Sequence, residues 1–301
     1  MTIHLNPRGD IAVGQIVAYL PVLAVAGFLV ARHGISRKSG WIFLVIVSLV
    51  RIVGGATEVA SQQNPSDVTL ATVSSTLTSA GVSPLLLATI GFLTTVCENT
   101  LSEDALIGTG LRLLSLLYTL ALAIIIFGGV KMGNAKSQSE LNTGTTLRHV
   151  GAVVMAVLFV AMFLLHLVCW SNISRITKAR RTLLAGISAA LPFLLVRIAY
   201  TVLSAFAPYP RSFSATGQVI TTTSESPLAK FNTSTGSWQI YLLMSVLTEY
   251  ATVVIYSIAG TRIRMDDDRP DYVKSATVEY DDERYRMGRE QWPGARGQWG
   301  R

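Results

Sequence analysis

The chain has 301 residues, of which half are hydrophobic and only 14% are charged, and its net charge is +7. An average soluble domain has about 25% charged residues, so the composition excludes a disordered chain and disfavours an ordinary soluble domain. Two cysteines exclude a disulfide scaffold and a cysteine-rich metal site. The basic excess lies in the hydrophobic part of the chain and not in the tail, which argues against nucleic acid as a partner.

Seven segments are long and apolar enough to cross a bilayer as helices, for which roughly 20 mostly apolar residues are needed. None of them carries the charged stripe that a soluble amphipathic helix shows. The sequence therefore predicts an all-α membrane protein, a bundle of seven transmembrane helices at residues 11–31, 41–60, 68–96, 105–127, 147–170, 182–206 and 238–260.

The orientation follows from the Lys and Arg residues of short loops, which favour the cytoplasmic side. The loops after the first and fifth spans lie on one side and hold seven basic residues, namely Arg32, Arg37, Lys38, Arg175, Lys178, Arg180 and Arg181. We therefore expect segment 1–10 and loop 207–237 outside, and the tail 261–301 in the cytoplasm. The tail has too few apolar residues for a core and is expected to be disordered. The protein is then a multi-pass protein of the plasma membrane or an endomembrane.

Two modification signals lie near the ends of spans. Asn232-Thr233-Ser234 in the outer loop is an N-glycosylation sequon, so Asn232 is a candidate glycan site. Cys97 and Cys169 fall near the cytoplasmic ends of their spans, where a disulfide is unfavourable. We interpret them as buried thiols, with palmitoylation as the alternative.

The ionisable residues inside the spans are the main candidates for function, because a charge in the bilayer interior is costly. A Leu-Val-Arg-Ile motif occurs twice, in the second and the sixth span, and places an arginine in each. The depths of these residues predict a buried polar or ligand-binding cluster of Arg51, Glu58, Arg197, Tyr200 and Glu249. The alternative is a set of salt bridges that only fixes helix packing, because breaking a buried pair is destabilising in either case.

The chain contains no motif for a nucleotide, a catalytic zinc ion or a serine nucleophile. Its four histidines lack the spacing of metal ligands. We therefore expect no cofactor and no metal site, and we assign no catalytic residue. The expected partners are membrane lipids and a small amphipathic ligand.

Several stretches resemble a family of fungal seven-helix membrane proteins known only as a domain of unknown function. The resemblance runs from about residue 11 to 260 and rests on Arg32-His33-Gly34, Ser39-Gly40-Trp41, 51–55, 81–88, 191–200 and the helix from Glu249 to Gly260. More distantly, the chain is similar to the fungal RTA-like lipid-translocating exporters. It has Arg197-Ile198-Ala199-Tyr200 where that family carries an Arg-x-x-x-Arg and Glu element. The resemblance implies a fungal source and no assigned chemistry.

Three functions are compatible with these features. The first, which we favour, is a non-enzymatic protein that binds, transports or senses a lipid-like molecule or a secondary metabolite, for example as an accessory protein of a biosynthetic gene cluster. The second is a membrane-embedded enzyme similar to terpene cyclases, in which Glu58 and Glu249 would act as buried carboxylic acids. The third is a seven-helix receptor that uses the outer loop and the tail.

Overall fold

The computed structural model describes residues 6–33, 40–64, 70, 73–74, 76–77, 82–97, 105–209, 211–213, 219–221, 226–233 and 235–262. The chain divides into a helical unit, Met1–Ile263, and a C-terminal unit, Arg264–Arg301. The second unit lies outside the described residues, so the prediction of a disordered tail stays a prediction. Thr261 and Arg262, assigned to that tail, instead belong to the last helix.

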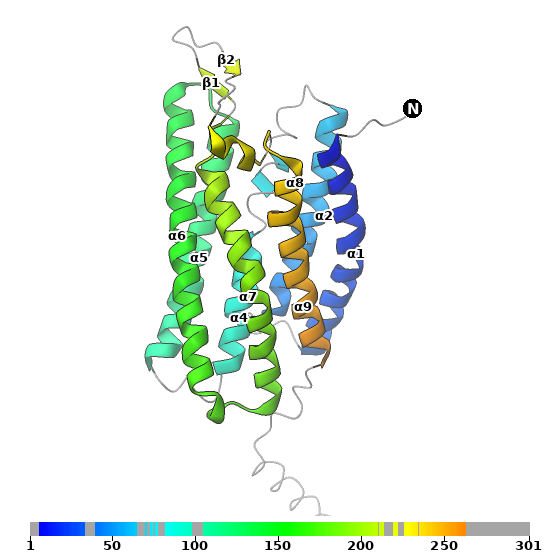
Figure 1. Cartoon of the computed structure of the whole chain (residues 1–301), viewed down its shortest axis with the longest axis vertical. Helices are drawn as coiled ribbons and strands as arrows, with labels where there is room; N and C mark the ends of the chain where they lie inside the picture. Colours follow the sequence, from blue (N-terminus) through cyan, green and yellow to red (C-terminus); the bar gives the residue numbers. More distant parts are fainter. Residues whose placement is uncertain are drawn as a thin grey trace, which may run out of the picture. The chain divides into compact units, whose positions relative to one another are not determined.

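The helices follow the predicted spans in chain order (Figure 1). Before the middle of the chain lie α1 (Pro7–His33), α2 (Trp41–Gln63), α4 (Val82–Cys97) and α5 (Ala105–Gly133). They are followed by α6 (Gln138–Ser171), the 3-10 turn η2 (Ile173–Arg175) and α7 (Lys178–Ala205). The last helix is built from α8 (Trp238–Tyr241), the π-helical turn η4 (Leu242–Leu247) and α9 (Thr248–Arg262).

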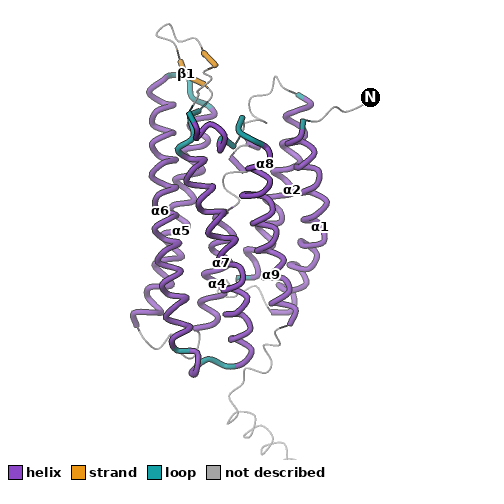
Figure 2. Tube along the Cα trace, in the orientation of Figure 1, coloured by secondary structure: helices purple, strands orange, loops and turns teal. Residues whose placement is uncertain are grey.

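The loop predicted at 207–237 contains short regular elements. Strands β1 (Arg211–Phe213) and β2 (Val219–Thr221) pair antiparallel, with Ser212 opposite Ile220, at the end of the bundle where α1 begins (Figure 2). The 3-10 turn η3 (Pro227–Phe231) then leads the chain toward α8.

The buried centre of the bundle is α4. This helix packs against α2, α5 and α7, whereas α1 pairs with α2, α5 with α6, and α7 with α9. From Pro84 to Cys97 nearly every side chain of α4 is buried, which is the property of a helix that is apolar on all sides.

The third span differs from the prediction, which placed it at 68–96. Helix α4 has 16 residues and so is about 24 Å long, less than the roughly 30 Å of a hydrocarbon core. Before Val82 the structure describes residues 70, 73–74 and 76–77, all of them helical. The rest of the predicted first half of this span lies outside the described residues.

An aromatic cluster joins α2, α4 and α9 at the end of the bundle opposite the strands. The ring centres of Trp41 and Phe92 are 4.4 Å apart, and those of Phe92 and Tyr256 are 4.9 Å apart. Gly40 precedes Trp41 with a φ of +70°, and a Cβ atom there would lie 2.7 Å from the Phe92 ring. Glycine is therefore required at this position by both its backbone conformation and its close approach to α4.

Two helices begin earlier than predicted. Helix α1 starts at Pro7, in the segment expected to be an irregular N-terminus, because proline is favoured in the first turn of a helix. Helix α6 starts at Gln138, nine residues before the predicted span, and the Ser137 side chain caps it by accepting a hydrogen bond from the Glu140 N–H. This Ser-x-x-Glu pattern is a capping box, and it extends α6 to 34 residues.

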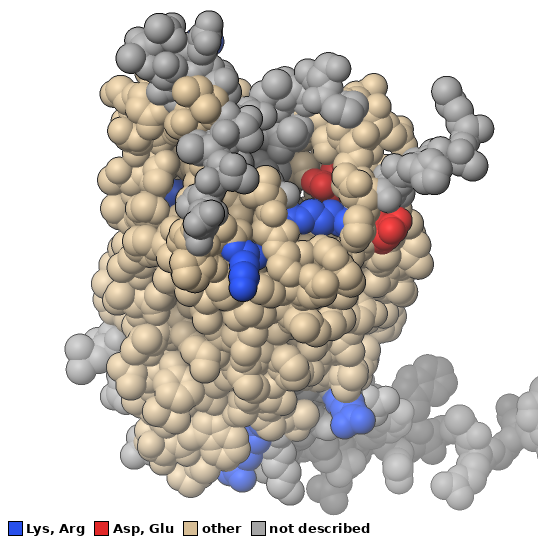
Figure 3. All heavy atoms as spheres, turned by 45° about the horizontal axis from the view of Figure 1, so that its top comes forward, with Lys and Arg blue, Asp and Glu red and all other residues tan. Residues whose placement is uncertain are grey.

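In the described part, six helices are long and apolar enough to cross a membrane, and α4 is a shorter apolar helix. The distribution of charged side chains on the surface agrees with a membrane-spanning bundle. The sides of the bundle seen in Figure 3 carry few charged side chains, whereas acidic and basic side chains lie together in a recess at the end that faces the viewer. The predicted all-α membrane bundle is thereby confirmed.

Candidate functional site

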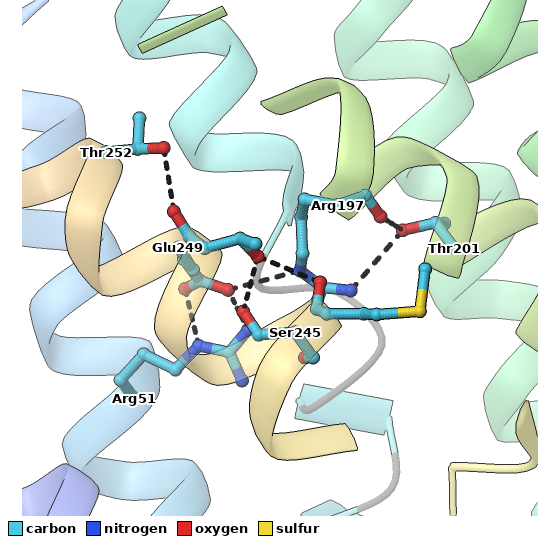
Figure 4. A network of polar contacts seen from close by, with 8 residues as sticks. Arg51, Arg197, Thr201, Ser245, Glu249 and Thr252 are labelled. Atoms are coloured by element: carbon cyan, nitrogen blue, oxygen red, sulfur yellow. Dashed lines mark hydrogen bonds and ion pairs between the residues drawn. The ribbon is translucent and has the colours of Figure 1, made fainter. Parts of the chain in front are cut away.

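Three of the predicted cluster residues form a buried ion network in the bundle. Arg51 on α2 donates from Nε to Oε1 of Glu249 on α9 at 2.5 Å, and its Nη2 donates to Oε2. Arg197 on α7 approaches the same Oε2 with Nε at 3.4 Å. All three side chains are at most 4% exposed. One carboxylate therefore ties together three helices (Figure 4).

The two Leu-Val-Arg-Ile motifs and a π-helical turn explain how these residues meet. Each motif supplies one of the two arginines, from helices on either side of α9. The turn η4 ends directly before Thr248, and Glu249 follows it. A π-helical turn adds a residue to one turn of a helix and is frequent at functional sites, so η4 sets the face on which Glu249 lies.

The remaining two predicted residues lie beside the network and outside its ion pairs. Glu58, two turns beyond Arg51 on α2, accepts hydrogen bonds from Gln62 Nε2 at 3.1 Å and from the Ser74 hydroxyl. The Tyr200 ring centre lies 5.5 Å from the Arg197 guanidinium carbon. Its phenolic oxygen is buried and has no hydrogen-bond partner among the described residues. The cluster was expected to hold two arginines and two glutamates together. In the structure both arginines contact Glu249, and Glu58 contacts neutral side chains.

Two small cavities flank the ion network. The first, the Arg51 cavity, has a volume of about 20 Å³ and is lined by residues of α1, α2 and the last helix, including Arg8, Gln15, Arg51 and Glu58. The second, the Arg148 cavity, has a volume of about 10 Å³ and is lined by residues of α5, α6 and α7, including Arg148, Arg197, Tyr200 and Thr201. Each has room for about one water molecule.

Two arginines beside these cavities were missed in the sequence. Arg8 belongs to segment 1–10, which the sequence predicts outside the membrane, and it lies in the first turn of α1, where Nη2 donates to the Gly236 carbonyl at 2.7 Å and to the Asn232 carbonyl at 3.2 Å. Arg148 was placed at a span boundary, but it lies three turns inside α6 and donates from Nη2 to the Ser204 carbonyl at 2.9 Å. The predicted span 147–170 already contains Arg148, and the capping box was the signal that the helix begins earlier and holds Arg148 deeper.

The geometry at Asn232 disfavours the predicted glycan. The side chain is 4% exposed, and its amide nitrogen donates to the Pro208 carbonyl at 2.8 Å. Its amide oxygen accepts from the Thr235 N–H at 3.1 Å. Since a glycan would be attached to that buried nitrogen, the sequon signal is outweighed by a structural role of Asn232 in the loop.

The two cysteines are buried and in contact. The Sγ atoms of Cys97 on α4 and Cys169 on α6 are 3.2 Å apart, and both residues are free thiols. The interpretation as buried thiols agrees with this geometry. Palmitoylation is disfavoured, because each side chain is 1% exposed.

A larger groove lies on the outer face of α6 and α7. It has a volume of about 730 Å³ and is lined mainly by aromatic and aliphatic side chains, including Phe159, Phe163, Leu191 and Leu195. Its polar end holds three side chains that contact one another. The Trp170 indole N–H donates to Ser188 Oγ at 2.9 Å and to His166 Nε2 at 3.1 Å, and the His166 and Ser188 atoms are 3.0 Å apart. The sequence did not predict that Pro192 and His166 line one groove.

In the described segments, no three His, Cys, Asp or Glu side chains lie close enough together to hold a metal ion.

The matching family model is described as a domain of unknown function (DUF7702) and covers residues 5–225. The chain belongs to this family. No curated protein and no solved structure gives a significant match. The matched region contains Arg51, Arg148, Arg197 and the groove, whereas Glu249 lies beyond it.

Proposed function

We propose that the protein binds a lipid-like molecule from the bilayer in the groove between α6 and α7. The observation that supports the proposal is the volume and lining of this groove, about 730 Å³ with one polar end. Binding sites for small molecules are commonly 300–1,000 Å³ in volume and mostly apolar, with a few placed polar groups. The groove suits an elongated apolar molecule that carries a single hydroxyl group.

The groove is open to the surface that the bilayer would cover. Val160, Leu167 and Leu195 line it and are each between 45% and 56% exposed. A ligand dissolved in the membrane could then enter sideways without crossing a polar barrier. The hydroxyl of such a ligand would meet Ser188 and His166, the polar groups that the groove offers. Sterols and other hydroxylated lipids are the class of molecule that this lining favours.

The orientation places this polar end in one leaflet. We infer from the seven basic residues of the two short loops that the N-terminus faces outside and the C-terminus faces the cytoplasm. His166 and Trp170 lie near the end of α6, next to the second of these loops. The polar end of the groove would therefore lie toward the cytoplasmic leaflet.

The contacts of Glu58 and Glu249 do not favour the enzyme alternative. A general acid must hold a proton and present it to the substrate. Both carboxylate oxygens of Glu249 accept hydrogen bonds from guanidinium groups. Glu58 is engaged by Gln62 and Ser74. A binding role therefore fits the geometry better than proton donation.

The proposal is tested by photo-crosslinking of the purified full-length protein in lipid nanodiscs. The probe is a sterol that carries a diazirine and an alkyne, and labelled peptides are mapped by mass spectrometry. We expect labelling on α6 and α7 around Phe163 and Leu191. Leu195→Trp, which fills the groove, should reduce it, whereas Leu116→Trp on α5 should not. The two leucines are matched, since they are 56% and 57% exposed.

A second pair of variants tests the polar end. Ser188→Ala removes a hydroxyl that contacts Trp170 and His166, whereas Ser171→Ala removes one that bonds only within its own helix, to the Leu167 carbonyl. We expect weaker labelling in the first variant alone. Labelling spread evenly over all lipid-facing helices, and unchanged by Leu195→Trp, would refute the proposed binding site.

A further inference from the structure

We propose that the Arg148 cavity binds a small anion, either chloride or one oxygen of a carboxylate group. The cavity shares Arg197 with the ion network and shares no lining residue with the lipid groove. Its lining brings together two guanidinium groups, of Arg148 and Arg197, and the phenol of Tyr200. No acidic residue lines it. This assignment goes beyond the proposed binding of a lipid-like molecule.

The charges around the cavity are unbalanced. Three arginines, Arg51, Arg148 and Arg197, lie in this part of the bundle, and Glu249 is the carboxylate that two of them share. Arg51 contacts both of its oxygens. Arg148 makes no ion pair with any described residue, and its hydrogen bond goes to the Ser204 carbonyl. An unpaired cation inside a membrane bundle is costly, and a bound anion would compensate it.

The buried hydroxyl of Tyr200 is a second observation that favours a bound ligand. The residue is 2% exposed, and its hydroxyl has no hydrogen-bond partner in the described part of the chain. A buried hydroxyl without a partner costs free energy, so such groups are commonly satisfied by water or by a bound ligand. Two other hydroxyls of the lining are already engaged, since Thr201 donates to the Arg197 carbonyl at 3.0 Å and Ser204 donates to the Thr201 carbonyl at 3.0 Å.

The size of the cavity limits the anion. A volume of about 10 Å³ is near the lower limit for one water molecule. A monatomic anion, or one oxygen of a carboxylate group, is therefore the largest species that fits without a backbone movement. Two guanidinium groups and a phenolic O–H supply the charge-assisted hydrogen bonds that such an anion requires.

The test measures thermal unfolding of the full-length protein in nanodiscs in three sodium salts at equal ionic strength. Chloride represents a free inorganic anion, acetate represents a carboxylate group, and gluconate is too large to enter. We expect the melting temperature to rise and saturate with chloride, with acetate, or with both, relative to gluconate. A response to chloride alone identifies an inorganic anion, and a response to acetate alone identifies an organic acid. Equal melting temperatures in all three salts would overturn the proposal.

Variants locate the site. Arg148→Gln and Tyr200→Phe should each weaken the apparent anion affinity by about ten- to a hundredfold, the effect of losing one hydrogen bond to a charged group. Arg112→Gln and Tyr118→Phe are the controls. Arg112 is exposed on α5, and Tyr118 is another buried tyrosine whose hydroxyl lacks a partner among the described residues, but neither lines the cavity. An anion response that persists unchanged in Arg148→Gln would place the site elsewhere and refute the assignment.

Discussion

Replacing Glu249 by glutamine is expected to destabilise the bundle strongly, because the carboxylate is shared by two buried arginines. The substitution keeps the shape of the side chain and removes its charge. Two unit charges about 4 Å apart attract each other by roughly 4 kcal/mol at an effective dielectric constant of about 20. In Glu249→Gln both attractions are lost, while the Arg51 and Arg197 guanidinium groups stay buried and repel each other.

The net loss of folding free energy can be taken from measurements on other buried salt bridges. Removing one partner of such a pair typically costs about 3–5 kcal/mol, which corresponds to a decrease in melting temperature of roughly 6–20 °C for a protein of this size. Arg51→Gln should approach this value, because Arg51 makes two contacts with the carboxylate. Arg197→Lys should cost less, because the Arg197 Nε lies farther from the carboxylate, at 3.4 Å.

The assay is thermal unfolding of the variants in nanodiscs, followed by intrinsic fluorescence. Glu58→Gln is the matched control, since Glu58 is half-buried and is held by neutral partners, Gln62 and Ser74. We expect its cost to stay near 1 kcal/mol, the value of a neutral hydrogen bond. The double variant Arg51→Gln/Glu249→Gln should be less destabilised than the sum of its parts. Equal melting temperatures for Glu249→Gln and Glu58→Gln would contradict the structural role of the network.

Three further predictions follow from local geometry. Gly40→Ala should cost about 2–4 kcal/mol, from a left-handed backbone and a clash with Phe92, whereas Gly27→Ala, which meets nothing within 4 Å, should be neutral or stabilising in a melting experiment. Asn232→Gln should change the mass of the protein from a glycosylating host only by the added methylene group, and a loss of mass on glycosidase treatment of the wild type would contradict this. Oxidation with copper phenanthroline should link Cys97 to Cys169, so that mass spectrometry of tryptic digests finds the cross-linked peptide; two alkylatable thiols after oxidation would speak against their contact of 3.2 Å.

The helical architecture was largely predictable from the sequence, because the bilayer imposes a length and a composition on each span. Helices lie at all seven predicted segments, and α2 and the last helix begin at the predicted Trp41 and Trp238. The errors arose where local capping overrode hydropathy. Pro7 and Ser137 start helices in polar sequence, and a window of apolar residues contains no information about a cap.

The site was predicted in part. The cost of burying charge was sufficient to select Arg51, Arg197 and Glu249, and the structure places them in contact. Hydropathy could not show that Glu58 bonds with Ser74 and not with an arginine of the network. The depth of a residue along its helix does not specify how the neighbouring helices are rotated about their axes. Arg148 was missed for a related reason, since the start of α6 decides how deep inside the helix this arginine lies.

The sequence by itself determined that the chain is a membrane-type helical bundle with a few buried charges, because one-dimensional apolar runs carry that information. Only the tertiary structure decided that two arginines share one carboxylate, that Arg148 and Tyr200 face one cavity, and that α6 and α7 enclose a groove with a polar end. These features depend on helix rotation and on which helices are neighbours. Both are set by side-chain packing between segments that are far apart in the chain.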